Sequence, residues 1–250
     1  MKSRWGVAAR VAAKVGLTAL LFIAVAPCAH ADLLGTVPVA PNGTVVPSLV
    51  PPGTYLGTLL ASEALAFTSF TGSDSGTILS AVYEEAGGTL DFYYQVDLDA
   101  TSTNCGGSGQ IACDALERVT ASSFAGVPTS VGYLIDGSFL GNGFTDGTEI
   151  PFTTDRSLNS SVVGFNFNSP GVLGILPGTD SVVFVVSTNA TAFTNGFVSV
   201  IDGIPSTVTA FEPASGTAVP APEPGTLTLF SSGLIGLGLA GLRRRSQRLA

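Results

Sequence analysis

The sequence predicts an all-β protein with one antiparallel β-sandwich or jelly-roll-like domain over residues 54–211. Apolar and polar residues alternate from Leu90 to Asp99, which is the period of a strand. The short, mostly β-branched run Val182–Val186 is typical of a strand buried on both faces. Turn dipeptides such as Asp202-Gly203 recur, and no stretch of a dozen residues has a helical period. Short strands joined by such turns favour two packed antiparallel sheets.

The same signals place about ten short strands along the domain. The expected strands are 54–60, 64–70, 76–84, 90–99, 116–124, 130–136, 163–167, 182–186, 197–202 and 206–211. Asp136-Gly137 and Asp146-Gly147 mark turns, and Asp202-Gly203 lies between the last two strands as in a hairpin. No fixed-length repeat is present, which argues against a solenoid or a propeller.

Proline-containing segments flank the domain on both sides. Residues 32–53 hold five prolines, so we expect an extended or irregular segment there rather than a folded element. Residues 212–221 combine proline with Ala, Ser, Gly and Thr, which is the composition of a linker. We expect this second segment to be a stalk between the domain and the C-terminal tail.

Charge is distributed unevenly along the chain. Residues 32–222 contain only two of the ten basic residues, Arg118 and Arg156, and seventeen of the eighteen acidic ones, a net charge of about −15. Such a surface repels phosphate groups, which excludes nucleic acid as a partner. Outside residues 1–31 the chain has no His or Lys, so the usual general base near neutral pH and Schiff-base lysines are missing.

The N-terminus has the three-part layout of a secretory signal peptide. Residues 1–14 are basic, Val15–Ala26 form an apolar run of twelve, and Ala29-His30-Ala31 gives a small-x-small pattern before Asp32. Twelve residues are too few to span a hydrocarbon core of about 30 Å. We therefore expect signal peptidase to remove residues 1–31, with Ala29 and Ala31 marking the cleavage site.

The C-terminus carries three elements in a fixed order. Pro222-Glu223-Pro224 precedes an uncharged stretch of eighteen residues, 225–242, which is followed by Arg243, Arg244 and Arg245 in a cluster that extends to 248. Eighteen helical residues rise about 27 Å, just enough to cross a membrane, and the arginines should stay on the cytoplasmic side. The glycines within the stretch favour temporary rather than permanent residence in the bilayer.

This tail, residues 222–250, closely resembles the PEP-CTERM sorting signal of exopolysaccharide-producing Gram-negative bacteria. The resemblance implies recognition by a membrane sorting enzyme of the exosortase type, which would cut near Pro222-Glu223-Pro224. It also implies an exported protein that is transiently anchored in the inner membrane and then released to the cell surface or extracellular matrix. Exopolysaccharide is the further partner that this destination suggests.

Cys105 and Cys113 are the only cysteines beyond the signal peptide. An isolated even pair in an oxidising compartment is most simply a disulfide, here one that closes a short loop. A zinc site would need two further soft ligands, and neither His nor Cys remains to supply them.

Several carboxylates lie on one predicted strand and could bind a metal ion. Asp91, Asp97 and Asp99 share a face of the strand 90–99, and Glu84 and Glu85 lie on the strand before it. Hard oxygen ligands suit Ca²⁺, so these residues are candidates for a calcium site; no other cofactor is expected. The sequence favours a simpler interpretation, a solvated outer face whose charge prevents pairing with other sheets. A third interpretation is the carboxylate pair of a glycosidase, although an exposed strand lacks the cleft that this chemistry needs.

The sequence therefore predicts a non-enzymatic surface or matrix protein associated with exopolysaccharide. One alternative is a lectin-like module, with or without calcium, in which Tyr83, Tyr93, Tyr94 and Tyr133 stack on sugars. A hydrolase that uses carboxylates alone is the second alternative. The identity of a ligand does not follow from the sequence.

Overall fold

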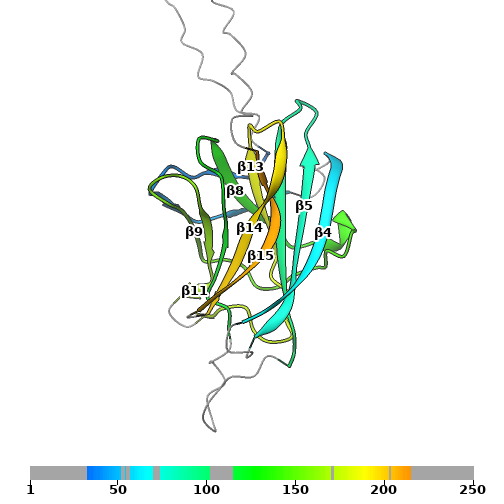
Figure 1. The fold of residues 1–250 in the computed structure, drawn as a ribbon, viewed down its shortest axis with the longest axis vertical. Coiled ribbons are helices and arrows are strands. Elements are labelled where there is room, and N and C mark those ends of the chain that lie inside the picture. The colour runs from blue at the N-terminus through cyan, green and yellow to red at the C-terminus, as the bar shows by residue number, and fades with distance from the viewer. Residues whose placement is uncertain are drawn as a thin grey trace, which may run out of the picture. The chain divides into compact units, whose positions relative to one another are not determined.

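The computed structural model describes residues 33–51, 54, 57–69, 74–101, 115–169, 172–202 and 204–214. All of them belong to one compact unit, His30–Val219. Residues 1–29 and 220–250 lie outside the described residues. The described unit is built from strands, and its one helical element is a single 3₁₀ turn (Figure 1).

The elements follow one another in a simple order along the chain. They are β1 (Val37–Pro38), β2 (Thr44–Val45), β3 (Ser48–Leu49), β4 (Thr58–Thr68), β5 (Ser75–Glu84), β6 (Leu90–Leu98), β7 (Arg118–Ala121), β8 (Thr129–Leu134), η1 (Gly137–Leu140), β9 (Thr153–Arg156), β10 (Val163–Asn166), β11 (Asn168–Ser169), β12 (Val172–Leu173), β13 (Val183–Thr188), β14 (Phe193–Asp202) and β15 (Ile204–Pro213).

Two sheets contain most of these strands, and the predicted all-β class is confirmed. The seven-stranded sheet has the order β1-β8-β13-β6-β5-β4, with β3 also on β8. The six-stranded sheet has the order β15-β14-β7-β10-β9-β2, and β11 and β12 form a separate pair. Neighbours pair antiparallel except β3 and β8, which run parallel. In Figure 1, β14 and β15 can be followed in one sheet and β4 and β5 in the other.

Inward-facing residues of both sheets form one hydrophobic core. The ring of Phe165 on β10 stacks on that of Phe184 on β13, with centroids 4.6 Å apart. Phe92 on β6 meets Phe124, after β7, edge to face at 5.7 Å. Aromatic pairs in these geometries add to the free energy gained by burying their area. The six-stranded sheet therefore packs against one face of the seven-stranded sheet.

A second core lies on the other face of the seven-stranded sheet. Leu79, Tyr93 and Val185 point away from the first core and are buried together with residues of two covering segments. One covering segment contributes Leu33 and Val50. The other covering segment contributes Leu140 and Phe144. The central strands β6 and β13 are consequently buried on both faces, as the run Val182–Val186 predicted.

The prediction that the N-terminal covering segment lies outside the domain is wrong. Residues 32–53 were expected to be an extended leader outside the domain, yet their described part carries β1, β2 and β3, which pair with both sheets. The amides of Val39 and Val50 donate to the carbonyls of Thr129 and Tyr133 at 3.0 and 2.9 Å. Prolines are tolerated because these strands lie at sheet edges, where a missing N–H costs no ladder bond.

Other differences concern element boundaries. The expected strands 54–60 and 64–70 both overlap a single edge strand, β4, which begins at Thr58, ends at Thr68 and has an irregularity in register between Leu59 and Ala61. The hairpin at Asp202-Gly203 is confirmed by the pairing of β14 with β15. That hairpin extends to Pro213, so the first residues of the expected linker 212–221 belong to the sheet.

Arg156, at the end of β9, holds several loops together. Its side chain is buried and donates to the carbonyls of Phe124 and Val127 at 2.8 and 2.5 Å. Further bonds reach the carbonyls of Ser160 and Val39 at 3.2 and 3.4 Å. A planar guanidinium with five donors suits such a set, because it can bond acceptors from several directions at once.

We expect Arg156→Ala to lower the free energy of unfolding by about 3 kcal/mol, because buried carbonyls lose their donors. Arg156→Lys should lower the free energy of unfolding by less, because lysine keeps the positive charge and some donors although it lacks the planar guanidinium. Urea unfolding measures both, with Thr209→Ala on the exposed face of β15 as the control. An Arg156→Ala loss no larger than that of the control would contradict this role.

Candidate functional site

The acidic strand face predicted for β6 is not solvated along its length. Asp91 is 0 % exposed and lies between Tyr83 of β5 and Ser187 of β13. Burial raises the pKa of Asp91 well above its usual range, and the adjacent Glu85 carboxyl raises it further. The expectation of an exposed outer face is therefore wrong for Asp91, because the segments around Leu33 and Leu140 cover this side of the sheet.

The other two carboxylates of the calcium hypothesis lie at the opposite end of the strand. The backbones of Asp97 and Asp180 form an isolated antiparallel β-bridge. Burial raises the pKa of Asp97, and the negative charge of Asp180 raises it further. Asp99 accepts a hydrogen bond from Ser75 Oγ at 2.6 Å. Six residues of strand separate Asp91 from Asp97, about 20 Å, so one ion cannot contact both. No group of three or more His, Cys, Asp or Glu side chains suited to a metal occurs among the described residues.

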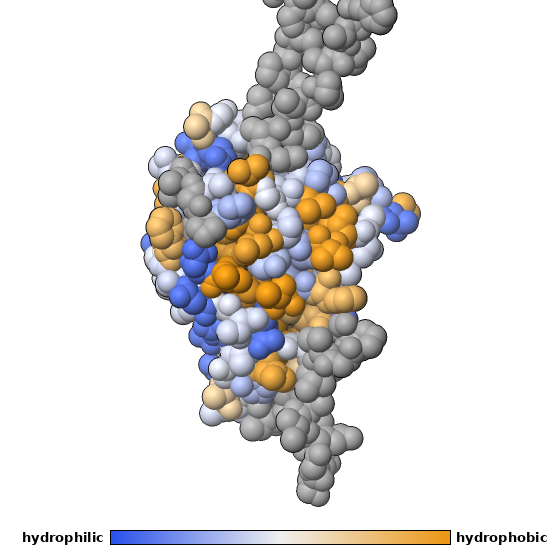
Figure 2. Space-filling view, turned by 180° about the vertical axis from the view of Figure 1, so that it is seen from behind, coloured by the Kyte–Doolittle hydropathy of each residue, from blue (hydrophilic) through white to orange (hydrophobic). Residues whose placement is uncertain are grey.

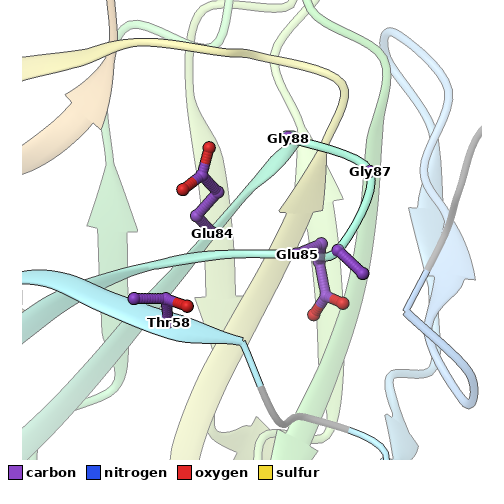
Figure 3. A pocket seen from close by; sticks show the side chains of 6 residues that line it. Thr58, Glu84, Glu85, Gly87 and Gly88 are labelled. Atoms are coloured by element: carbon purple, nitrogen blue, oxygen red, sulfur yellow. The ribbon is translucent and has the colours of Figure 1, made fainter.

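Glu84 and Glu85 border an open hollow at the β5–β6 hairpin. Thr58 of β4 and Ala86, Gly87 and Gly88 of the turn complete its lining. Figure 3 shows the two glutamate side chains leaving the backbone in opposite directions, as successive strand residues do. Only Glu85 therefore shares a face with Asp91, and the hollow does not bring its two carboxylates together.

Three of the four tyrosines predicted to stack on sugars are buried. Tyr83, Tyr93 and Tyr94 are buried, and Tyr133 is half-buried against the inter-sheet core. The Tyr94 hydroxyl donates to the carbonyl of Phe211 at 2.6 Å, and that of Tyr83 to the carbonyl of Leu140 at 3.2 Å. These rings serve packing because both faces of their sheet are covered.

A polar cluster lies on the outer face of the six-stranded sheet. Arg118 of β7 makes a two-pronged ion pair with Asp155 of β9, one arm at 2.8 Å, and also bonds Asn166 Oδ1 of β10. The Asn166 amide donates to Asp155 at 2.7 Å, so the three groups form a closed network. The Arg118 hydrogen bond lowers the pKa of Asp155. All three side chains stay partly accessible to solvent.

A glycine makes room for the Arg118 guanidinium. Gly164 pairs with Asp155 on one side and with Thr120 on the other, in the middle of this face. A Cβ at Gly164 would meet the guanidinium, so the absent side chain lets Arg118 lie flat on the sheet. Sequence reasoning missed this cluster, since its members come from three strands and are paired only by register.

The same outer face continues onto β14 and β15. Ser199 and Thr207 are hydrogen-bonded to one another at 2.7 Å, and Phe197 remains 58 % exposed. Phe197 is four residues along β14 from Ile201, the partner of Arg118, which is about 13 Å. A charged fork, hydroxyls and an exposed aromatic ring thus share one sheet face.

Apolar surface gathers on the opposite side of the unit. Figure 2 shows it as several patches separated by polar side chains. Leu34, Leu49, Ile135 and Phe139 are large exposed apolar side chains from or beside the two covering segments. Within the part of the chain that the structure describes, no helix is long and apolar enough to cross a membrane.

Several predicted sites lie outside the described residues. These are the signal cleavage site at Ala29 and Ala31, the pair Cys105 and Cys113, and the tail motif from Pro222 through Arg245. Their cleavage, disulfide and sorting roles stay predictions.

Comparison with known proteins gives no relative from which a function could be transferred. The chain matches no family model, no curated protein and no solved structure.

The Arg118–Asp155 pair should make stability depend on acid pH. Because the folded-state pKa of Asp155 is lowered, its contribution is complete above the unfolded value of about 4 and is lost as pH falls below that value. Asp155→Asn should therefore cost about 1 kcal/mol at pH 7 and progressively less below pH 4. Thermal unfolding across pH measures this difference, and a cost that does not change with pH would contradict it.

Proposed function

We propose that this protein is an exported, non-enzymatic component of the cell surface or the exopolysaccharide matrix. The observation that carries the proposal is the order of elements at the C-terminus, where Pro222-Glu223-Pro224 precedes the apolar stretch 225–242 and the arginine cluster. A signal peptide over residues 1–31 would start export, and an exosortase-type enzyme would complete sorting after transient anchoring in the inner membrane. The resemblance to PEP-CTERM tails supports both steps.

The domain that would be delivered is, in this proposal, an antiparallel β-sandwich of jelly-roll type. The stacking of Phe165 on Phe184 across the two sheets supports face-to-face packing. The low number of basic residues in this domain also suits delivery to the outside of the cell, because an acidic surface limits non-specific adhesion to anionic groups.

The arrangement of carboxylates favours a non-enzymatic role over a hydrolase. Glycosidases hold two carboxyl groups roughly 5–10 Å apart on either side of an accessible bond. Asp91 instead contacts Glu85 directly and is fully buried, and Asp97 contacts Asp180. Neither pair leaves space for a sugar between its members.

Binding of a matrix glycan is the second candidate function, and the outer face of the six-stranded sheet favours it. Arg118, Asp155 and Asn166 offer charged and amide groups that can bond sugar hydroxyls, and Phe197 offers an apolar ring for a sugar face. Their separation suits an extended chain rather than a single sugar. The surface would then hold the delivered protein in the matrix.

Sorting predicts removal of the tail. Protein recovered from the surface or medium of its native host should lack Arg243–Ala250 in an intact-mass measurement, because the sorting enzyme cuts before the apolar stretch. Replacing Pro222 and Pro224 with alanine should leave the tail attached. Native surface protein that still carries the arginine cluster would refute the sorting proposal.

If this surface binds a glycan, two different substitutions at the Arg118 network should weaken binding to a similar extent. Arg118→Ala removes the fork, and Gly164→Ala displaces it while keeping the charge. Both should weaken binding to exopolysaccharide purified from the host by about tenfold in titration calorimetry. Leu158→Ala, an exposed apolar position elsewhere, serves as the control. Unchanged binding in both variants would rule this surface out as a glycan-binding site.

A further inference from the structure

The buried carboxylate of Asp91 has no hydrogen-bond partner of ordinary geometry at either oxygen. The Ser187 hydroxyl and the Thr188 backbone lie near enough to favour its ionised form, whereas burial and Glu85 disfavour it. A fully buried carboxylate is costly unless a proton or a cation neutralises it. The atoms around Asp91 indicate whether the neutralising species is a proton or a cation.

Those surroundings are rich in oxygen atoms that lack donors. Glu85 Oε1, Thr89 Oγ1 and Asn189 Oδ1 are all buried without a hydrogen-bond partner. Thr89 is two residues before Asp91 on the same face, and the Glu85 amide donates to the Thr89 carbonyl at 2.8 Å. The Leu90 amide donates to the carbonyl of Ala190 at 2.9 Å. This bond places Asn189, the residue before Ala190, beside the start of β6.

No basic side chain of the described domain is free to neutralise this group. Arg118 is engaged with Asp155 on the other sheet, and Arg156 is bound to loop carbonyls. Residues 32–222 contain no other Lys, Arg or His. Within residues 32–222, neutralisation of Asp91 therefore falls to a proton or to an ion that enters from solution.

A cation accounts for more of these atoms than a proton does. One proton shared by Asp91 and Glu85 satisfies a single bond and leaves the Asn189 oxygen without a donor. Two carboxylates neutralise a divalent ion, and uncharged oxygen atoms can serve as further ligands of the same ion. Hydroxyl, amide and carboxylate oxygens in a flexible arrangement suit Ca²⁺ better than Mg²⁺, which demands a near-ideal octahedron.

We propose that Asp91 and Glu85, with the side-chain oxygens of Thr89 and Asn189, form a calcium site at the base of the β5–β6 hairpin. Glu85, Gly87 and Gly88 border an open hollow at this hairpin (Figure 3), and in this proposal the ion enters from solution on that side. Ser187 lies beside Asp91 and accepts a hydrogen bond from the Leu33 amide at 3.2 Å. Bound calcium would thus fasten the N-terminal covering segment to the sheet. The site stands apart from the Asp97–Asp99 end of the strand and does not depend on export or sorting.

The test compares calcium with magnesium on the purified full-length protein after chelation. At matched ionic strength, millimolar Ca²⁺ should raise the Tm well beyond Mg²⁺, and calorimetry should give one calcium per chain. Asp91→Asn and Glu85→Gln should each weaken calcium binding by about tenfold or more. The double variant Asp97→Asn, Asp99→Asn should keep the full response, because it alters the other end of β6.

A substitution at a buried position can destabilise the fold for reasons unrelated to calcium, so the stability of each variant is also measured in protein from which calcium has been removed by a chelator. Without calcium, Asp91→Asn should be at least as stable as the parent, because it removes an uncompensated carboxylate. With calcium the order should reverse. Equal Tm shifts from Ca²⁺ and Mg²⁺, or a calcium response lost only in the Asp97→Asn, Asp99→Asn variant, would overturn the proposal. So would a chelator-insensitive Tm, which identifies Asp91 and Glu85 as a proton-sharing pair.

Discussion

Burial of the central strands on both faces is the constraint on which the rest of this structure depends. One face of β6 and β13 packs against the six-stranded sheet, and the other is covered by segments that contain Leu33 and Leu140. Covering loops make the second face dry, so every polar group on it needs a partner. Asp91, Gln95 and Ser187 all lie on that face, and their environments follow from it.

Two of these polar residues show different solutions to the same problem. The Gln95 amide donates to the carbonyls of Thr145 and Ser181 at 2.9 and 2.8 Å, and its oxygen accepts from the Thr145 amide. Gln95 thereby fixes one covering loop to the strand by hydrogen bonds alone. Asp91 cannot do the same, because a carboxylate has no donors when ionised and no basic residue is at hand. A fold with so few cations must satisfy its buried acids with protons or metal ions.

Strand periodicity revealed much of the fold, and its limits have physical causes. The alternation over residues 90–99 identifies β6, but an Asp-Tyr-Gln-Asp face looks solvated until the covering segments are known. Prolines at 38, 47 and 51 suggested a leader, although edge positions accept them. β9, with the sequence Thr-Thr-Asp-Arg, has no apolar signal at all, since its buried members are Thr154 and Arg156. Candidate sites were harder still, because Arg118, Asp155 and Asn166 meet only through register.

The covered face can be examined directly by amide hydrogen exchange under native conditions. The Val39 and Val50 amides, bonded to β8 carbonyls, should be protected to nearly the same degree as those of β6, because the segment and the sheet open together. Rapid exchange at Val39 and Val50 while β6 stays protected would mean that the segment is not part of the domain. Asp91 would then lie on an open sheet face, and the burial of β6 on both sides would be contradicted.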